Sequence, residues 1–446
     1  MSKKSNILIA IVIVLLLAVG FAYWYLFFYG PGNQVTPVVT SGRPSTGFTP
    51  FSSSPVQTPD NNGNTNNSNT TQASPAPDSG SALPSLRLLS NTPVGGYSAS
   101  TTANTKLASS TTFIRWIDRG RGNVYEARKD SLDITTLSNT LLPKVYESVW
   151  NKNINAFIGT ILGDNDTPTV LYSQIIAQTA PAIVKPITAS STDVSTANTQ
   201  TLTPFQLKGK NLPKNMIAYA ASPDGSKIFM LTNENNAGVG YIGNFDGTTV
   251  KKIFDTPLTQ LNVEWPEANT IAITTKGSAS QPGFLYFINP KTGLWKKILG
   301  PTFGLSAKVS HDAKYVIASA AGSNQSIFTS IYTVSTLKSS DPIIRTLADK
   351  CAWGNFNKNM VYCAVPTQID QATYPDDWYR GSVSFIDKIW QVDAITGEVH
   401  LVTSIVDQSD RIIDAYNLGL DAKDDWLFFM NKNDLSLWAF DLFAKQ

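Results

Sequence analysis

Residues 220–230 read Ala-Ala-Ser-Pro-Asp-Gly-Ser-Lys-Ile-Phe-Met, and this stretch decides the fold. Small apolar residues end one segment, four turn-forming residues follow, and an apolar run begins the next segment. Pro fixes its own φ angle, Asp and Ser bond to nearby backbone, and Gly tolerates positive φ. The stretch therefore predicts two antiparallel strands joined by a tight turn.

The same strand–turn–strand unit recurs at a fixed interval. Its equivalent positions are Ala221, Trp265, Val309 and Trp353, each 44 residues after the one before. A period in the 40s with several short strands per repeat is typical of β-propeller blades. Because one blade cannot bury its own faces, the repeat predicts a closed ring of blades.

Further units complete the expected ring. Residues 150–157 and 420–427 fit the same pattern, and a second hairpin after each regular unit brings the blade to four strands. In the fifth blade we expect that hairpin at 331–334 and 343–347. The C-terminal blade lacks an outer strand, which residues 85–90 can supply. We therefore predict an all-β, seven-bladed propeller over 85–446, with six or eight blades as alternatives.

Two spacings are longer than the period. They predict insertions into the propeller near residues 178–204 and 366–385.

The N-terminal region has a different composition. Residues 7–28 are uncharged and almost entirely apolar, and a helix of this length crosses a hydrocarbon core of ~30 Å. Lys3 and Lys4 precede it, so the positive-inside rule places residues 1–6 in the cytoplasm and the propeller outside it, in the periplasm or at the cell surface. A cleaved signal peptide is the alternative.

Residues 29–84 are rich in Ser, Thr, Pro and Asn and poor in apolar residues. Such a segment buries too little apolar surface to offset the entropy of ordering it, so we predict a disordered linker. The formal net charge of the chain is +2, and the sequence has no long basic run beyond Lys3 and Lys4. This argues against a nucleic-acid partner. The expected partner of residues 7–28 is the lipid bilayer.

The only two cysteines are Cys351 and Cys363, in one predicted hairpin. With the turn centred near Asn357 they face each other across the strand pair, at a spacing that a disulfide tolerates. We predict a disulfide, which suits an oxidising exterior. Two buried free thiols are the alternative.

Residues 222–228 resemble the WD40-like (TolB-type) propeller repeats of bacterial envelope proteins. Segments 88–96, 114–119, 374–381 and 384–387 also look like membrane-anchored propellers of bacteria. The resemblance implies an anchored, extracytoplasmic, non-catalytic domain, and it implies no particular ligand.

Catalytic residues are scarce in the sequence. The only histidines, His311 and His400, fall in a predicted turn and an outer strand. A three-histidine zinc set is excluded, and no motif supports a serine triad. We therefore predict no catalytic residues, no metal and no cofactor, and a protein that is not an enzyme.

The densest polar and aromatic cluster lies in the second insertion. Its members are Tyr374, Asp376, Asp377, Trp378, Tyr379 and Arg380. Loops on a rigid scaffold often carry binding residues, and Trp, Tyr and Arg dominate interface hot spots. We predict a binding site here. The alternatives are packing of Trp378 and Tyr379 onto the propeller and, least favoured, hydrolysis by the carboxylate pair.

These observations predict a protein–protein interaction or scaffold module at the cell envelope. Its expected partner is an envelope protein or, less favoured, a cell-wall glycan. The competing hypothesis is a propeller enzyme, either a quinoprotein-like dehydrogenase or a hydrolase.

Overall fold

The computed structural model describes residues 83–104, 109–163, 167–178 and 204–444. Within these ranges no helix is both long enough and apolar enough to span a bilayer. The predicted transmembrane segment 7–28, nearly all of the linker 29–84 and most of the insertion near 178–204 lie outside the described residues.

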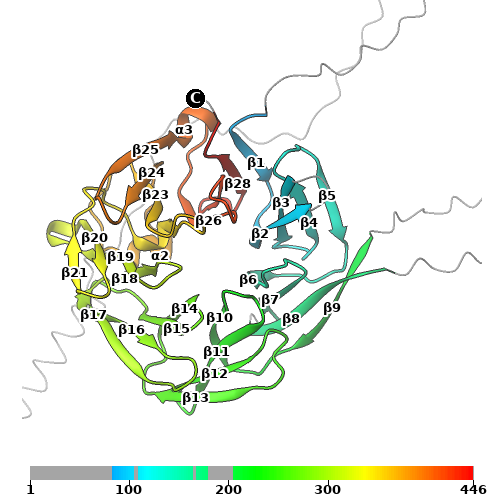
Figure 1. The fold of residues 1–446 in the computed structure, drawn as a ribbon, viewed down its shortest axis with the longest axis horizontal. Helices are drawn as coiled ribbons and strands as arrows, with labels where there is room; N and C mark the ends of the chain where they lie inside the picture. The colour runs from blue at the N-terminus through cyan, green and yellow to red at the C-terminus, as the bar shows by residue number, and fades with distance from the viewer. Residues whose placement is uncertain (1–82, 105–108, 164–166, 179–203, 445–446) are drawn as a thin grey trace, which may run out of the picture. The chain divides into compact units, whose positions relative to one another are not determined.

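The described residues form seven four-stranded antiparallel sheets arranged as a ring (Figure 1). Blades one to three contain β2 (Val94–Asn104), β3 (Ser109–Asp118), β4 (Val124–Arg128), β5 (Ile134–Ser138); β6 (Val145–Trp150), β7 (Ala156–Leu162), β8 (Pro168–Ala177), β9 (Phe205–Asn211); and β10 (Met216–Ala221), β11 (Lys227–Glu234), β12 (Ala237–Asn244), β13 (Lys251–Thr256). Blades four and five contain β14 (Leu261–Glu267), β15 (Thr270–Thr275), β16 (Pro282–Ile288), β17 (Trp295–Phe303); and β18 (Ser306–Val309), β19 (Tyr315–Ala321), β20 (Ile327–Thr333), β21 (Lys338–Ser340). Blades six and seven contain β22 (Cys351–Trp353), β23 (Met360–Pro366), β24 (Asp387–Asp393), β25 (Val399–Ser404); and β26 (Ala415–Leu420), β27 (Trp426–Asn431), β28 (Leu437–Asp441), β1 (Leu86–Ser90).

The ring closes, as predicted, where the strand near residues 85–90 pairs with the C-terminal blade. Strand β1 pairs with β28 in blade seven, with Leu86 opposite Phe440. Arg87 lies over the Trp426 ring, 3.9 Å from its centroid. Its guanidinium also donates to the main-chain oxygens of Lys129 and Ser131, in the loop that follows β4 of blade one. The seven-bladed, all-β prediction is confirmed.

The serine and aspartate of the repeated turn hold the hairpin together. The Ser222 hydroxyl accepts a bond from the Lys227 main-chain N–H (2.9 Å) and donates to Asp224 (2.6 Å). Gly225 has φ 70°, and a Cβ at this position would lie 2.3 Å from the main-chain nitrogen of Lys152 in the neighbouring blade. This turn needs glycine both for its conformation and for the approach of blade two.

One strand assignment was wrong. Residues 343–347 do not form the outer strand of blade five, which is β21 instead. After β21 the chain leaves the sheet and passes to blade six. The Thr346 main-chain N–H donates to Thr329 (2.9 Å), and the Thr346 hydroxyl donates to the carbonyl of Ala364 (2.6 Å). Ile344 is buried in this connection, so the apolar pattern there reflects inter-blade packing and not strand pairing.

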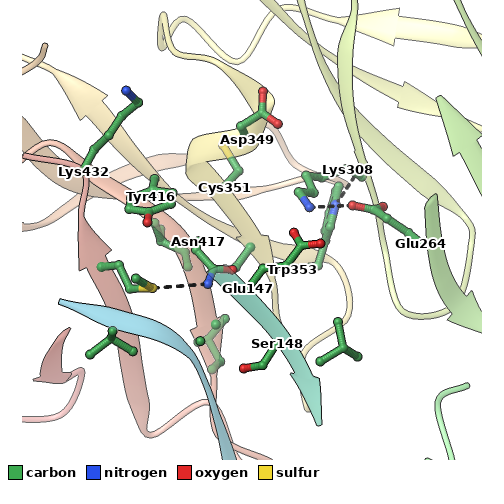
Figure 2. Close-up of a pocket in the computed structure, with 18 of the residues that line it drawn as sticks. Glu147, Ser148, Glu264, Lys308, Asp349, Cys351, Trp353, Tyr416, Asn417 and Lys432 are labelled. Atoms are coloured by element: carbon green, nitrogen blue, oxygen red, sulfur yellow. Dashed lines mark hydrogen bonds and ion pairs between the residues drawn. The ribbon is translucent and has the colours of Figure 1, made fainter. Parts of the chain in front are cut away.

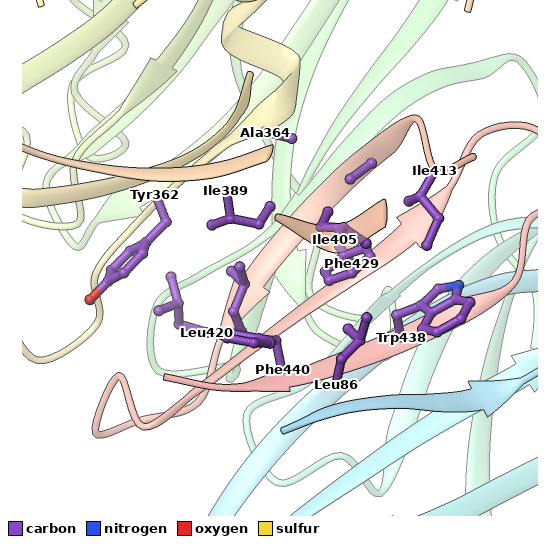
Figure 3. Packing of buried hydrophobic residues seen from close by; sticks show 12 residues of the cluster. Leu86, Tyr362, Ala364, Ile389, Ile405, Ile413, Leu420, Phe429, Trp438 and Phe440 are labelled. Carbon is purple, nitrogen blue, oxygen red and sulfur yellow. The ribbon is translucent and has the colours of Figure 1, made fainter. Parts of the chain in front are cut away.

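The apolar core lies between successive blades. Figure 3 shows the contact between blades six and seven, where Tyr362 and Ile389 face Leu420 and Phe440. Similar clusters join the other neighbouring blades. Each blade thus buries its faces against its neighbours, as the repeat required.

The predicted disulfide is present. Cys351 pairs with Cys363 across β22 and β23, and their sulfurs are bonded. Both residues are buried next to the core that joins blades five and six.

Removing this disulfide is expected to lower the free energy of unfolding. The bond closes a short loop, with a sequence separation of 12, and loop-closure entropy then gives about 3 kcal/mol. The measurement is guanidinium unfolding of the parent and of a Cys351→Ala/Cys363→Ala variant. Unfolding the parent with added reductant is the control, and it should approach the variant. Equal midpoints for parent and variant would contradict the expectation.

Candidate functional site: the central cavity and the blade-six insertion

The innermost strands of the blades enclose a central cavity of about 810 Å³. A second hollow of about 680 Å³ lies beside it, over blades two to five. The two spaces share the lining residues Tyr146, Glu147, Tyr219, Glu264, Lys308 and Asp349. Because they have these walls in common, we treat the two spaces as one site.

A lysine–glutamate pair occupies one wall of the cavity. Lys308 on β18 lies 2.6 Å from Glu264 on β14, and both side chains are partly exposed. The Glu264 carboxylate raises the pKa of Lys308. The Trp353 indole N–H donates to the Lys308 carbonyl (3.0 Å), which holds β18 against β22. This wall therefore presents a neutralised pair to the cavity.

Two other carboxylates also line the cavity. Glu147 on β6 accepts a bond from the Thr160 hydroxyl (3.1 Å), and Asp349 accepts bonds from the hydroxyls of Ser306 (2.6 Å) and Tyr379 (2.8 Å). Among the described residues neither carboxylate has a basic side chain within 4.0 Å. In Figure 2, Glu147 and the Lys308–Glu264 pair reach the pocket from strands, and Asp349 reaches it from the short helical turn before β22.

Tyrosines supply the hydroxyl donors of the site. Burial raises the pKa of Tyr219, and Glu147 raises it further. Burial likewise raises the pKa of Tyr379, with a second contribution from Asp349. Both phenols therefore stay protonated and can donate hydrogen bonds near neutral pH.

The blade-six insertion carries the predicted binding cluster. Its one α-helical turn, α2 (Asp376–Arg380), lies between β23 and β24. Asp376 accepts bonds from the Ser278 hydroxyl (2.9 Å) and the Ala279 main-chain N–H (2.7 Å), which fasten α2 to the loop after β15 in blade four. The Tyr374 ring is buried, and its hydroxyl donates to the Asp370 carbonyl (2.8 Å).

The remaining members of the cluster separate into buried and accessible side chains. Trp378 is 3% exposed and donates its indole N–H to Asp414 (2.9 Å), whereas Tyr379 is 39% exposed. Asp377 accepts a bond from the Thr373 main-chain N–H (2.6 Å) and pairs with Arg380, most of whose side chain is exposed. Trp378 and Tyr379 both line the central cavity. Of the two cluster members that line the cavity, Tyr379 is therefore the one that can be substituted with less effect on packing.

Sequence reasoning missed a buried charged cluster directly beneath α2. Lys350 contacts Asp414 and lies 2.8 Å from Asp387, and all three side chains are 0% exposed. Burial raises the pKa of Asp387 to about 6. The sequence carries no clear signal for this cluster, because Lys350 directly follows Asp349 in a stretch that also contains Arg345 and Thr346.

The two histidines lie apart from this cluster. His400 is on the outer strand β25 and is mostly exposed. His311 lies in the turn after β18 and lines the cavity. The described part of the chain contains no group of three or more histidine, cysteine or acidic side chains suited to a metal ion.

No family model and no curated protein sequence matches the chain. Among solved structures, an oligogalacturonate lyase in complex with manganese is 10% identical, covers 79% of this chain and 97% of its own, and has a TM-score of 0.46. TolB from Acinetobacter baumannii is 10% identical, with 77% and 79% coverage and a TM-score of 0.38. The propeller domain of the Trilobed protease from Pyrococcus furiosus is 12% identical, with 62% and 74% coverage and a TM-score of 0.37. With every TM-score below 0.5, these similarities assign no activity, and the seven-bladed fold rests on the sheet order of the chain itself.

Proposed function

We propose that the protein is a binding module that receives a segment of a partner protein in its central cavity. The observation that carries this proposal is the pair of carboxylates, Glu147 and Asp349, which line a cavity of about 810 Å³ without a cationic partner among the described residues. Cavities of this size are typical of ligand sites.

The carboxylates of Glu147 and Asp349 favour a basic segment. Lysine and arginine side chains form charge-assisted hydrogen bonds with carboxylates, and these are the strongest polar contacts available to a peptide. Lys308 does not supply such a hydrogen bond to Glu147 or Asp349, because its ammonium is paired with Glu264. If residues 7–28 anchor the chain in the membrane, the partner is a protein of the cell envelope.

The proposal is tested with charged peptides of known sequence. Binding of fluorescent oligolysine to the full-length chain is followed by anisotropy, with oligoglutamate as the charge control. We expect Glu147→Gln to weaken oligolysine binding about tenfold, because it removes one hydrogen bond to a charged group. Glu398→Gln is the matched control, since the Glu398 side chain is 71% exposed and lies outside the cavity.

Two results would contradict this function. Equal oligolysine affinity in the Glu147→Gln and Glu398→Gln variants would place the charge-dependent site outside the cavity. If neither oligolysine nor oligoglutamate binds, the proposal of a basic peptide ligand is wrong. Binding assays with cell-wall glycan fragments, and quinone-dependent dye reduction, would then test the glycan-binding and enzymatic alternatives.

A further inference from the structure

Lys350, Asp387 and Asp414 come from three separate segments and meet in one sealed space. Lys350 ends the short 3₁₀ helix η3 (Ala348–Lys350) before β22. Asp387 begins β24, and Asp414 directly precedes β26 of blade seven. All three side chains are fully buried.

The walls of this space are apolar. The Lys350 ammonium lies 5.3 Å from the centre of the Trp378 ring and 5.1 Å from that of Phe385. Charges in such surroundings carry a large desolvation cost that ion pairing only partly offsets. A reaction that turned the ammonium and one carboxylate into a neutral amide would remove two of the buried charges.

In such a reaction the Lys350 amine would attack a carboxyl carbon, and Asp414 has the contacts expected of the attacked carboxyl group. Its Oδ1 contacts the Lys350 Nζ. Its Oδ2 accepts bonds from the Trp378 indole N–H (2.9 Å) and the Phe385 main-chain N–H (3.1 Å). Two N–H donors on one oxygen form an oxyanion hole, which stabilises negative charge when a nucleophile adds to the carboxyl carbon.

Asp387 has the contacts expected of a proton carrier. Its Oδ2 accepts bonds from Lys350 Nζ (2.8 Å) and the Ala415 main-chain N–H (2.6 Å). Its Oδ1 is buried and has no hydrogen-bond partner among the described residues. Burial raises the pKa of this carboxyl to about 6, which suits a group that takes up and returns a proton near neutral pH.

We propose that Lys350 and Asp414 become joined by an intramolecular isopeptide bond, with Asp387 carrying the proton. Asp387 takes one proton from the Lys350 ammonium, and the neutral Nζ then attacks Cγ of Asp414. A C–N bond forms, and negative charge develops on Oδ2 between its two N–H donors. The bond from Cγ to Oδ1 then breaks.

The step is balanced without any outside reagent. Of the three protons on the ammonium, one stays on the amide nitrogen and two leave with Oδ1 as a water molecule. Asp387 carries these two protons from nitrogen to oxygen one after the other and is regenerated. No oxidant, reductant or cofactor takes part.

The bond would fasten two blades beneath the cavity mouth. Its ends are 64 residues apart in the chain and belong to blades six and seven. Trp378 packs against this point, so the bond would also secure the base of the blade-six insertion.

The test is the mass of the native full-length protein after reduction of the disulfide and denaturation. We expect a mass one water molecule below that calculated from the sequence. Trypsin should fail to cut after Lys350, and the digest should contain one branched peptide joining Lys350 to Asp414. A full mass with both peptides separate would overturn the proposal, and so would a branch at Asp387 in place of Asp414.

Three variants locate the chemistry. Lys350→Arg keeps the cation but lacks the amine. This variant should therefore have the mass calculated from its sequence, with no loss of water. Asp387→Asn removes the proton carrier and should leave the two segments unjoined. Asp414→Asn should lose ammonia in place of water and give the same final mass as the linked parent. A linked Lys350→Arg variant would overturn the assignment of Lys350. If a variant fails to fold, the branched peptide of the parent still decides the question.

Discussion

Replacing Lys350 by methionine is expected to lower the free energy of unfolding by about 3–5 kcal/mol, the cost of removing one partner from a buried ion pair. Asp387 and Asp414 would remain fully buried without their cation. The sign of the effect does not depend on the covalent state, because methionine can form neither the ion pair nor an isopeptide bond. The measurement is chemical denaturation of the full-length chain followed by tryptophan fluorescence.

The control for this variant is Lys338→Met. Lys338 is an exposed residue of the edge strand β21, and an exposed substitution of this kind changes stability by about 0.5 kcal/mol or less. Equal losses from the two variants would contradict the view that the buried cluster stabilises the junction of blades six and seven.

Removing residues 1–90 is expected to open the ring and make the protein aggregate, whereas removing residues 1–82 should not. The longer deletion takes away β1, with the buried side chains of Leu86 and Leu89. Two buried leucines contribute on the order of 4 kcal/mol or more. It also uncovers the largely apolar edge of β28, and unpaired strand edges promote association.

Size-exclusion chromatography and thermal unfolding of the two truncations measure this effect. The shorter deletion is the matched control, because it leaves every described strand intact. A monomeric 91–446 fragment with the unfolding temperature of 83–446 would show that closure through β1 contributes little.

The architecture could be predicted from the sequence because its determinants are local. The turn at Ser222, Asp224 and Gly225 satisfies its own hydrogen bonds. Repetition of such a turn every 44 residues then leaves few ways to bury the strands. The Cys351–Cys363 pair was predictable for the same reason, since both residues belong to one hairpin.

The outer strand of blade five shows where local pattern fails. Residues 343–347 have the apolar character of a strand, but Ile344 packs in the core between blades five and six. Apolar periodicity reports that a side chain is buried, not whether the neighbouring surface is a strand or another blade.

The lining of the central cavity could not be predicted from the sequence, because it forms only when the blades close into a ring. Glu147 comes from blade two, Glu264 from blade four and Asp349 from the 3₁₀ helix before blade six, at places where the sequence has no motif in common. The predicted cluster in the insertion was a partial guide: Tyr379 reaches this cavity and binds Asp349, while Trp378 and Asp376 fasten the insertion to the propeller.

The sequence by itself determined the repeat, the four-stranded blades, the closure by residues 85–90 and the disulfide, because each depends on residues close in the chain or on a fixed period. Only the tertiary structure decided which polar side chains meet. Lys350, Asp387 and Asp414 lie 37 and 64 residues apart, and their contact depends on how blade seven docks against blade six. The same holds for the carboxylates of the cavity, because the inner strands acquire a common axis only when the ring is closed.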